Sequence, residues 1–417
     1  MKRSCKIICL LLSLVAVLGS LVGCSSLGFV TDAQLEQLLN DRIGGATVEG
    51  GDNNYITIQT EGGGNLALAS KALLSAVSIY CSHKTLSTDL FGRVTEGTAT
   101  SAGSGVIYKL DKERGEAYVI TNYHVVYNSA STSQNKISDD IYLFLYGQED
   151  NEDYAIPASY VGGSMQYDLA VLKVEDSRVL AESNAVAAEL ASSYDVAVLD
   201  TAIAVGNPEG HGISVTVGYV NVDSEYVTLN FSGTTQSQDV RIRVMRIDTA
   251  VNSGNSGGGL YNASGELIGI VNAKMTDSEN IGYAIPLSIV KGIADNVLAH
   301  CDGVTETSPQ KATLGITLEA ERLYTVVDAE SGRIVKREDV VISEVASGSL
   351  AAGVLEEGDR ILSVTVDGVT YEATRIFSVI DAMLNARANS TVTLTVRRSD
   401  AMINVNITIP KSALKDC

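Results

Sequence analysis

Three side chains in this sequence have the types needed for nucleophilic cleavage of an acyl bond. His124 lies in the apolar run 119–126, and Asp168 opens a second apolar run. Ser256 stands in the glycine-rich segment 252–259. A serine hydroxyl becomes a nucleophile when an imidazole takes its proton and a carboxylate holds that imidazole in the correct tautomer. We therefore predict a catalytic triad of His124, Asp168 and Ser256.

The segment around the serine is also suited to bind the oxyanion that forms during attack. Gly254, Asn255 and Ser256 are predicted to form this oxyanion hole, since small residues let the backbone turn tightly and bring amide groups to one point. Each motif alone also fits a structural role, such as a glycine-rich hairpin, a capping histidine or an aspartate in a turn. The order His, Asp, Ser within one domain favours the triad, and it is the chymotrypsin-like order rather than that of hydrolases with a nucleophile elbow.

The remaining histidines and the cysteines indicate neither a metal site nor a cofactor. His83, His211 and His300 lie in polar or linker-like surroundings, so we predict surface or capping roles for them. Cys81 lies in an apolar run that favours a buried thiol, with pairing to Cys301 as an alternative in an oxidising compartment. The six cysteines show no spacing typical of a metal site. We expect no metal and no cofactor, because triad chemistry uses protein groups alone.

The composition favours β structure in two globular domains. The chain has 417 residues, 45% of them hydrophobic, with 38 Gly, 5 Pro and no Trp. Many short Val/Ile/Thr-rich runs are separated by turn residues, which is typical of a β-barrel or sandwich. The formal charge of −20, without a basic cluster beyond the first residues, argues against nucleic acid as a partner.

The amino terminus has the pattern of an export signal. A basic start precedes the apolar stretch 7–22, which ends in Leu-Val-Gly before Cys24. This ending resembles the bacterial lipobox, in which the cysteine thiol is acylated. We therefore predict a lipid on Cys24 and attachment to a membrane through it, with an uncleaved signal anchor as the alternative.

The sequence divides into five segments. They are a lipoprotein signal peptide (1–24), a polar Gly-rich tether (25–66), a protease domain (67–300), a linker (301–312) and a second, smaller domain (313–412). The tether is predicted from its glycine pairs and polarity, and the linker from its polar stretch before Pro309.

At these motifs the chain resembles the HtrA family of trypsin-like proteases with carboxy-terminal PDZ domains. The resemblance covers about 67–410 and includes the segments 103–106, 204–208 and 282–286 besides the triad motifs. It implies a mainly β protein, with a chymotrypsin-like double six-stranded β-barrel protease domain followed by one α+β PDZ domain. It also implies a homotrimer in the bacterial cell envelope that cleaves unfolded or damaged envelope proteins.

The resemblance further implies two binding sites. Ile270, Asn272 and Ala284 are expected to wall the specificity pocket, whose apolar lining would suit an aliphatic side chain. The segments 313–317 and 350–362 resemble the carboxylate-binding loop and the long signature of PDZ domains. The residues expected to bind carboxy-terminal peptides are Leu314, Gly315, Ile316, Thr317, Val379 and Met383.

Two residues depart from the family pattern next to the nucleophile. Ser253 and Gly259 stand where the family usually has proline. Because proline restricts the unfolded loop, its loss predicts a more mobile oxyanion loop.

We interpret the chain as a serine endopeptidase with PDZ-mediated recognition of carboxy-terminal peptides. The alternative is a proteolytically weak lipoprotein chaperone or PDZ scaffold that uses the same fold for binding.

Overall fold

The computed structural model describes most of the chain from residue 71 onward. The described residues are 46–50, 56–60, 71–88, 93–133, 135–149, 151–192, 194, 196–230, 239–274, 281–301, 307–329 and 332–417. The predicted signal peptide and Cys24 lie outside them. Two compact units can be separated, Met1–Ala67 and Leu68–Cys417. In the first, β1 (Ala46–Gly50) and β2 (Ile56–Thr60) form an antiparallel pair within the predicted tether.

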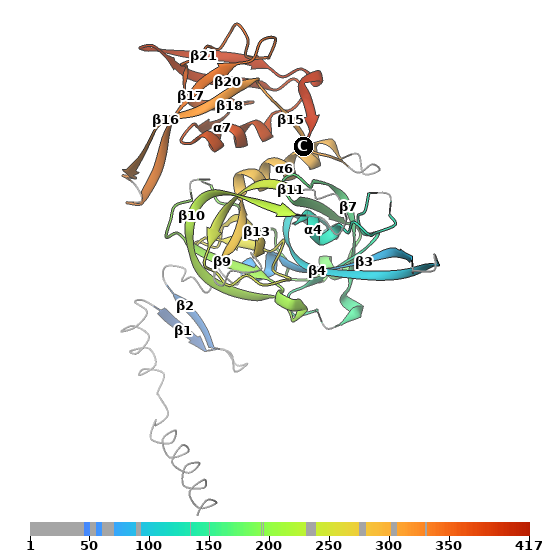
Figure 1. Cartoon of the computed structure of the whole chain (residues 1–417). Helices are drawn as coiled ribbons and strands as arrows, with labels where there is room; N and C mark the ends of the chain where they lie inside the picture. The colour runs from blue at the N-terminus through green and yellow to red at the C-terminus, as the bar shows by residue number, and fades with distance from the viewer. Residues whose placement is uncertain are drawn as a thin grey trace, which may run out of the picture. The chain divides into compact units, whose positions relative to one another are not determined.

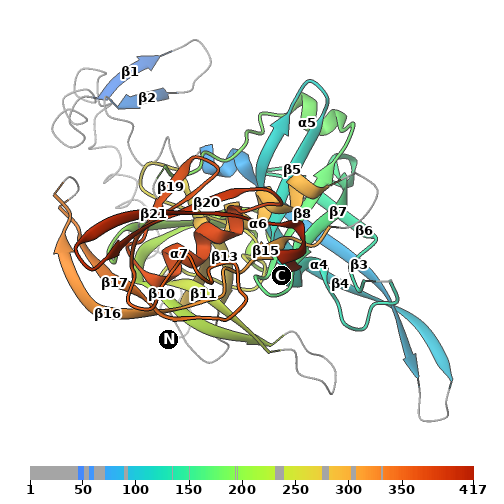
Figure 2. The same cartoon turned by 90° about the horizontal axis from the view of Figure 1, so that it is seen from above.

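The second unit begins with a barrel of six antiparallel strands. The strands are β3 (Ala76–Thr88), β4 (Val94–Asp111), β5 (Glu116–Thr121), β6 (Asp140–Leu145), β7 (Ile156–Ser164) and β8 (Leu169–Val174), closed in the order β3-β4-β5-β8-β7-β6. Inward-pointing side chains such as Ile79, Ile107 and Leu143 fill it. Figure 2 shows β3 and β4 continuing outward as a two-stranded ribbon. The short helices α4 (Tyr123–Val126) and α5 (Arg178–Glu182) follow β5 and β8.

A second barrel of six antiparallel strands follows. It consists of β9 (Thr201–Gly206), β10 (Ser214–Asn230), β11 (Asp239–Ile247), β12 (Gly259–Tyr261), β13 (Leu267–Lys274) and β14 (Gly282–Pro286), closed in the order β10-β11-β14-β13-β12-β9. Helix α6 (Leu287–His300), which is labelled in Figure 1, begins directly after β14 in the chain. The two closed six-stranded barrels confirm the predicted double-barrel fold.

The carboxy-terminal domain is a mixed α+β domain, as predicted. Its sheet has the order β16-β17-β18-β20-β21, with β19 paired to β18. The elements are β15 (Gln310–Ala312), β16 (Ile316–Val327), β17 (Ile334–Val345), β18 (Arg360–Val366), β19 (Val369–Glu372), α7 (Ile376–Ala382), β20 (Thr391–Arg398), β21 (Ala401–Thr408) and β22 (Leu414–Asp416). Within the described residues β16 pairs only with β17, so its other edge is open.

One leucine of the carboxy-terminal domain packs into the core of the barrels. Leu384 lies in the single turn Met383–Asn385 after α7, is fully buried and belongs to the apolar cluster that both barrels share. Its Cβ faces Gly292 of α6, where an added Cβ would lie only 2.7 Å away. The amide of Asn296 also donates to the carbonyl of Leu384 at 3.3 Å. The carboxy-terminal domain is therefore joined to the barrels by core packing.

Replacing this leucine should destabilise the second unit. Leu384→Ala removes buried methyl groups and leaves a cavity, so we expect the free energy of unfolding to fall by about 2–5 kcal/mol. Leu323→Ala is the control, because Leu323 is 63% exposed and its truncation should change stability by less than about 0.5 kcal/mol. Urea unfolding of the full chain measures both, and equal effects would show that the packing is not stabilising.

Candidate active site

The structure brings His124 and Asp168 together as a hydrogen-bonded pair. His124 lies in α4, and Asp168 stands just before β8. The Nδ1 of His124 bonds Oδ2 of Asp168 at 2.8 Å, and the backbone N–H of His124 donates to Oδ1 at 3.0 Å. Because Nδ1 carries the proton that faces the carboxylate, Nε2 has a free lone pair. The imidazole is about a third exposed, so this lone pair is available as a base.

Two asparagines hold the aspartate of this pair. Asp168 is fully buried and has a left-handed backbone with φ of 49°. The amide of Asn122 donates to its carbonyl at 2.9 Å, and the amide of Asn272 donates to Oδ2 at 2.6 Å. A buried charge needs such donors, and a non-glycine residue with positive φ costs about 1–3 kcal/mol. The surrounding structure therefore fixes this carboxylate.

The environment raises the pKa of His124 above its ordinary value. Burial opposes the charged form, but the negative charge of Asp168 and its hydrogen bond to Nδ1 outweigh that penalty. A higher pKa makes the imidazole a stronger base. It also means that His124 becomes protonated, and so loses its lone pair, at a higher pH than an ordinary histidine.

The loop that carries Ser256 is tied to the first barrel by Ser104. The Ser104 hydroxyl donates to the carbonyl of Gly254 at 2.6 Å and accepts from the N–H of Asn207 at 2.8 Å. The Ser104 N–H donates to the carbonyl of Ser256 at 2.8 Å. A Cβ on the neighbouring Gly103 would lie 3.1 Å from that carbonyl and 2.7 Å from Val125. Glycine at this position lets β4 approach the nucleophile loop closely.

Two backbone amides of this loop have no acceptor. Within the described residues, no hydrogen bond uses the N–H of Gly254 or of Ser256. The N–H of Asn255 instead donates to Asn252 at 3.0 Å. Gly254 has φ of 96°, and the carbonyl of Ser253 accepts from Glu209 at 2.7 Å. Gly254 and Ser256 can therefore supply oxyanion donors, whereas the Asn255 amide is already used. The mobility inferred from Ser253 and Gly259 stays a prediction.

The hydroxyl of Ser256 is hydrogen-bonded to a backbone carbonyl. Its Oγ donates to the carbonyl of Asn272 at 2.5 Å. Within the described residues, no hydrogen bond joins this hydroxyl to His124. The expected base is thus paired with its carboxylate, and the Ser256 hydroxyl would have to leave the Asn272 carbonyl before it could donate to Nε2.

The residues expected to wall the specificity pocket are all fully buried, and their role in that pocket stays a prediction. Ile270 and Ala284 are fully buried in the apolar clusters of the second barrel. Asn272 is also fully buried, and its amide nitrogen faces Asp168. The structure gives Asn272 a triad contact that its sequence pattern did not indicate.

One of the other histidines departs from expectation. His83 is buried in β3, with its Nε2 3.4 Å from the Ser101 hydroxyl, so the predicted surface or capping role is wrong for it. His211 is exposed, and His300 bonds the carbonyl of Asn296 in the last turn of α6.

Cys81 and Cys301 are free thiols. The residues that the structure describes contain no group of three metal-ligating side chains.

Some of the residues expected to bind peptides lie at the open edge of β16, and the others lie in the core of the carboxy-terminal domain. Gly315 has φ of 76° and precedes β16, whose open edge begins at Ile316 and Thr317. Leu314, Val379 and Met383 are almost fully buried in the core of the carboxy-terminal domain. The open strand edge is thus present, and peptide contact by Leu314, Val379 and Met383 stays a prediction.

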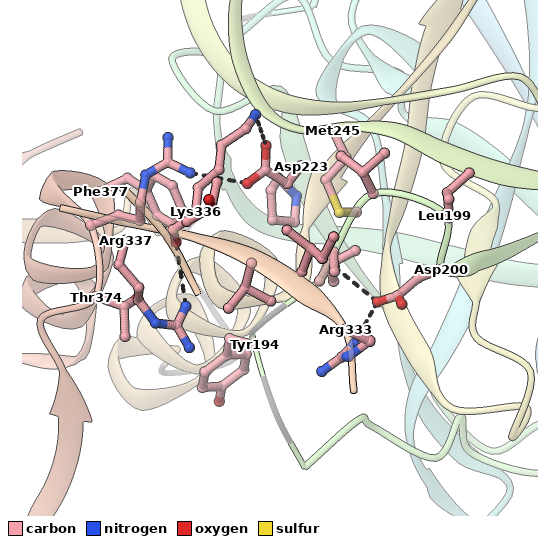
Figure 3. Close-up of a pocket in the computed structure, with 18 of the residues that line it drawn as sticks. Tyr194, Leu199, Asp200, Asp223, Met245, Arg333, Lys336, Arg337, Thr374 and Phe377 are labelled. Carbon is pink, nitrogen blue, oxygen red and sulfur yellow. Dashed lines mark hydrogen bonds and ion pairs between the residues drawn. The ribbon is translucent and has the colours of Figure 1, made fainter. Parts of the chain in front are cut away.

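A cavity of about 560 Å³ lies between the second barrel and the carboxy-terminal domain (Figure 3). Charged side chains cross it in ion pairs. Asp223 accepts from Lys336 at 3.1 Å and from Arg375 at 3.0 Å, and Arg333 donates to Asp200 at 2.7 Å. No triad residue lines this cavity, so we interpret it as a domain junction.

Comparisons with known proteins agree with this architecture. The family model described as a trypsin-like peptidase domain matches residues 103–270, and the one described as a PDZ domain matches residues 312–409. The chain is 32% identical over 325 residues to "Serine protease Do-like HtrA" of Lactococcus lactis subsp. lactis (strain IL1403), covering 75% of this chain and 71% of that protein.

Two other relatives match a smaller share of their own length. "Serine protease Do-like HtrA" of Bacillus subtilis (strain 168) is 38% identical over 49% of this chain and 41% of that protein. "Periplasmic serine endoprotease DegP" of Escherichia coli (strain K12) is 31% identical over 75% of this chain and 57% of that protein. The matched part therefore spans less than half of the Bacillus protein and just over half of the Escherichia protein.

The raised pKa of His124 predicts the pH dependence of any peptidase activity. As the pH falls, His124 becomes protonated and can no longer act as a base. We therefore expect kcat/KM to decline toward acid pH with its midpoint above about pH 6.5, the ordinary pKa of histidine. Asp168→Asn removes the charge that raises this pKa. We expect the midpoint to move to lower pH and kcat to fall about 10⁴-fold. Asp176→Asn, at an exposed carboxylate, is the control and should change neither quantity. An acid limb that stays in place in Asp168→Asn would contradict this interpretation.

Ser104 is predicted to order the oxyanion donors. Ser104→Ala leaves the Gly254 carbonyl and the Asn207 N–H without their partner, so kcat should fall about ten- to hundredfold with little change in KM. Ser78→Ala is a matched control, because the buried hydroxyl of Ser78 has no hydrogen-bond partner within the described residues. Steady-state kinetics on a peptide substrate compare the two variants. A Ser104→Ala enzyme with the kcat of Ser78→Ala would exclude this role.

Proposed function

Since the chain belongs to the HtrA family of trypsin-like serine proteases, we propose that it cleaves unfolded or damaged proteins of the bacterial cell envelope with His124, Asp168 and Ser256. The observation that carries this proposal is the hydrogen-bonded pair of His124 and Asp168, beside a serine loop in which two backbone amides have no acceptor within the described residues. This arrangement supplies a base, its orienting carboxylate and oxyanion donors.

The proposed reaction follows the usual two steps of acyl transfer. The Ser256 hydroxyl gives its proton to Nε2 of His124 as Oγ forms a bond with the scissile carbonyl carbon. The N–H groups of Gly254 and Ser256 bind the oxyanion. The amine then leaves with the proton from His124, and water hydrolyses the acyl-enzyme by the same base. Asp168 stabilises the imidazolium throughout without taking its proton.

The PDZ domain is proposed to bind carboxy-terminal peptide segments. The open edge of β16 offers unpaired backbone groups to an added strand, and the left-handed Gly315 directly precedes it. A peptide added there would form main-chain hydrogen bonds with β16, and its terminal carboxylate would meet the loop that ends at Gly315. This mode accepts many sequences, which suits recognition of unfolded chains.

We further propose that the protein acts outside the cytoplasm, attached to a membrane by a lipid on Cys24, and works as a homotrimer. The export pattern before Cys24 supports this location, and the Escherichia relative is named periplasmic. Within the described residues, no helix has the length and apolar character needed to cross a bilayer.

Loss of the nucleophile should abolish proteolysis. Ser256→Ala is expected to lower kcat/KM for a reduced, alkylated model protein by at least about 10³-fold. Ser264→Ala, at an exposed serine in a turn of the second barrel, is the control and should cleave like the wild type. Gel-based cleavage with and without carboxy-terminal peptides measures both. If the wild type and Ser256→Ala cleave equally little but bind the unfolded protein equally well, the chain is a chaperone or scaffold instead.

A further inference from the structure

The helix that carries the proposed base is too short to be stable alone. α4 (Tyr123–Val126) has four residues, and its N-cap, Asn122, makes no side-chain capping hydrogen bond. A single isolated turn gains too few hydrogen bonds to offset the entropy of ordering it. The two contacts of His124 with Asp168 use its backbone N–H and its ring. Both therefore depend on what holds α4 in place.

Strand β4 contacts this helix at two points, and both are on Val125. Ser101 and Gly103 lie on the same face of β4, since they are two residues apart. The glycine leaves room for the Val125 side chain, because an added Cβ there would lie 2.7 Å from each of its methyl groups. The hydroxyl of Ser101 donates to the Val125 carbonyl at 2.8 Å. This hydrogen bond ties the residue that follows His124 to the wall of the first barrel.

Two side chains of β3 orient the Ser101 hydroxyl. Cys81 stands directly opposite Ser101 in the strand pairing, and His83 lies two residues further along on the same face. The Nε2 of His83 is 3.4 Å from the Ser101 Oγ, and the Cys81 thiol is also in hydrogen-bonding contact with Ser101. The only proton of this hydroxyl already faces Val125. His83 must therefore donate and Ser101 must accept.

Burial keeps both of these partners uncharged. His83 is almost fully buried, and burial lowers its pKa although the negative charge of Asp139 opposes this effect. Burial likewise raises the pKa of the Cys81 thiol to about 12, although its hydrogen bond with Ser101 acts in the opposite direction. A neutral imidazole with its proton on Nε2 and a protonated thiol are both donors. The Ser101 hydroxyl thus accepts from β3 and donates only to α4.

We propose that Ser101 is a positioning residue for the base: its hydroxyl, oriented from β3, holds α4 so that His124 stays aligned on Asp168. Without this hydrogen bond a helix carbonyl loses its donor, and α4 can shift on β4. Both hydrogen bonds between His124 and Asp168 then lengthen on average. The imidazole becomes a weaker base and faces the nucleophile less often in the correct orientation. This inference rests on the proposed function, because it requires His124 to act as the base.

Threonine and valine at position 101 test this role, because they have nearly the same shape and differ in the hydroxyl. Ser101→Thr keeps the donor, so kcat on a peptide substrate should stay within about twofold of the wild type. Ser101→Val should lower kcat about three- to tenfold, the rate equivalent of one neutral hydrogen bond, with KM changed less than about twofold. The midpoint of the acid limb of kcat/KM should also move to lower pH in Ser101→Val, since weaker contact with Asp168 lowers the pKa of His124.

A double-mutant cycle tests the orienting role of His83. His83→Phe removes the ring N–H but keeps a planar ring, so kcat should fall about two- to threefold while Ser101 is present. In the Ser101→Val background the same substitution should have no further effect on kcat, because it acts only through that hydroxyl. Additive effects of the two substitutions would exclude His83 from this role.

Thr100→Val is the matched control, because it makes the same hydroxyl-to-methyl change on the exposed, opposite face of β4, and it should alter neither kcat nor the acid limb. Ser101→Ala, which adds no bulk, replaces Ser101→Val if the valine variant does not fold. Equal kcat in Ser101→Thr and Ser101→Val, or a lower kcat in Ser101→Val without a shift of the acid limb, would exclude the positioning role and leave the proposed function in place. A wild-type protein that cleaves no peptide would refute both.

Discussion

The buried carboxylate of Asp168 is the constraint on which the rest of the site depends. A fully buried charge is stable only if donors surround it. Here the donors come from His124 in the first barrel and from Asn272 in the second. The charge is therefore satisfied only when both barrels are folded and in contact. The hydrogen bond between Asp168 and His124 also orients the imidazole, and together with the negative charge of Asp168 it raises the pKa of His124 against the opposing effect of burial.

The nucleophile loop depends on contacts of the same kind between the barrels. Ser104 in β4 bonds the carbonyls of Gly254 and Ser256 across the interface. These bonds fix two carbonyl groups of a loop in which the amides of Gly254 and Ser256 have no acceptor among the described residues. Leu384 adds a third link, because it packs a residue of the PDZ domain into the apolar core of the barrels. The contacts that form the proposed active site and the contact that joins the PDZ domain to the barrels are therefore parts of the same folded unit.

Residue types and their order were enough to predict the pairing of His124 with Asp168 and the glycine-dependent turn at Gly254, and the family resemblance implied the double-barrel fold. The contact of Asn272 with Asp168 could not be predicted, because it joins segments 104 residues apart in the chain. The role of Ser104 likewise requires contact between segments 150 residues apart. His83 was misjudged from its polar neighbours, although the alternation along β3 places it on the same inward side as Cys81. The sequence therefore indicated residues that belong to a recognisable catalytic motif. It did not indicate side chains whose role depends only on which strands pack together.

Covalent labelling would show directly whether Ser256 is the activated nucleophile. The full chain would be treated with a fluorophosphonate, digested and analysed by mass spectrometry to locate the modified residue. We predict a single adduct on the peptide that contains Ser256, and its loss in His124→Ala, because the base that activates the hydroxyl is then missing. An adduct on another serine, or unchanged labelling of Ser256 in His124→Ala, would contradict it.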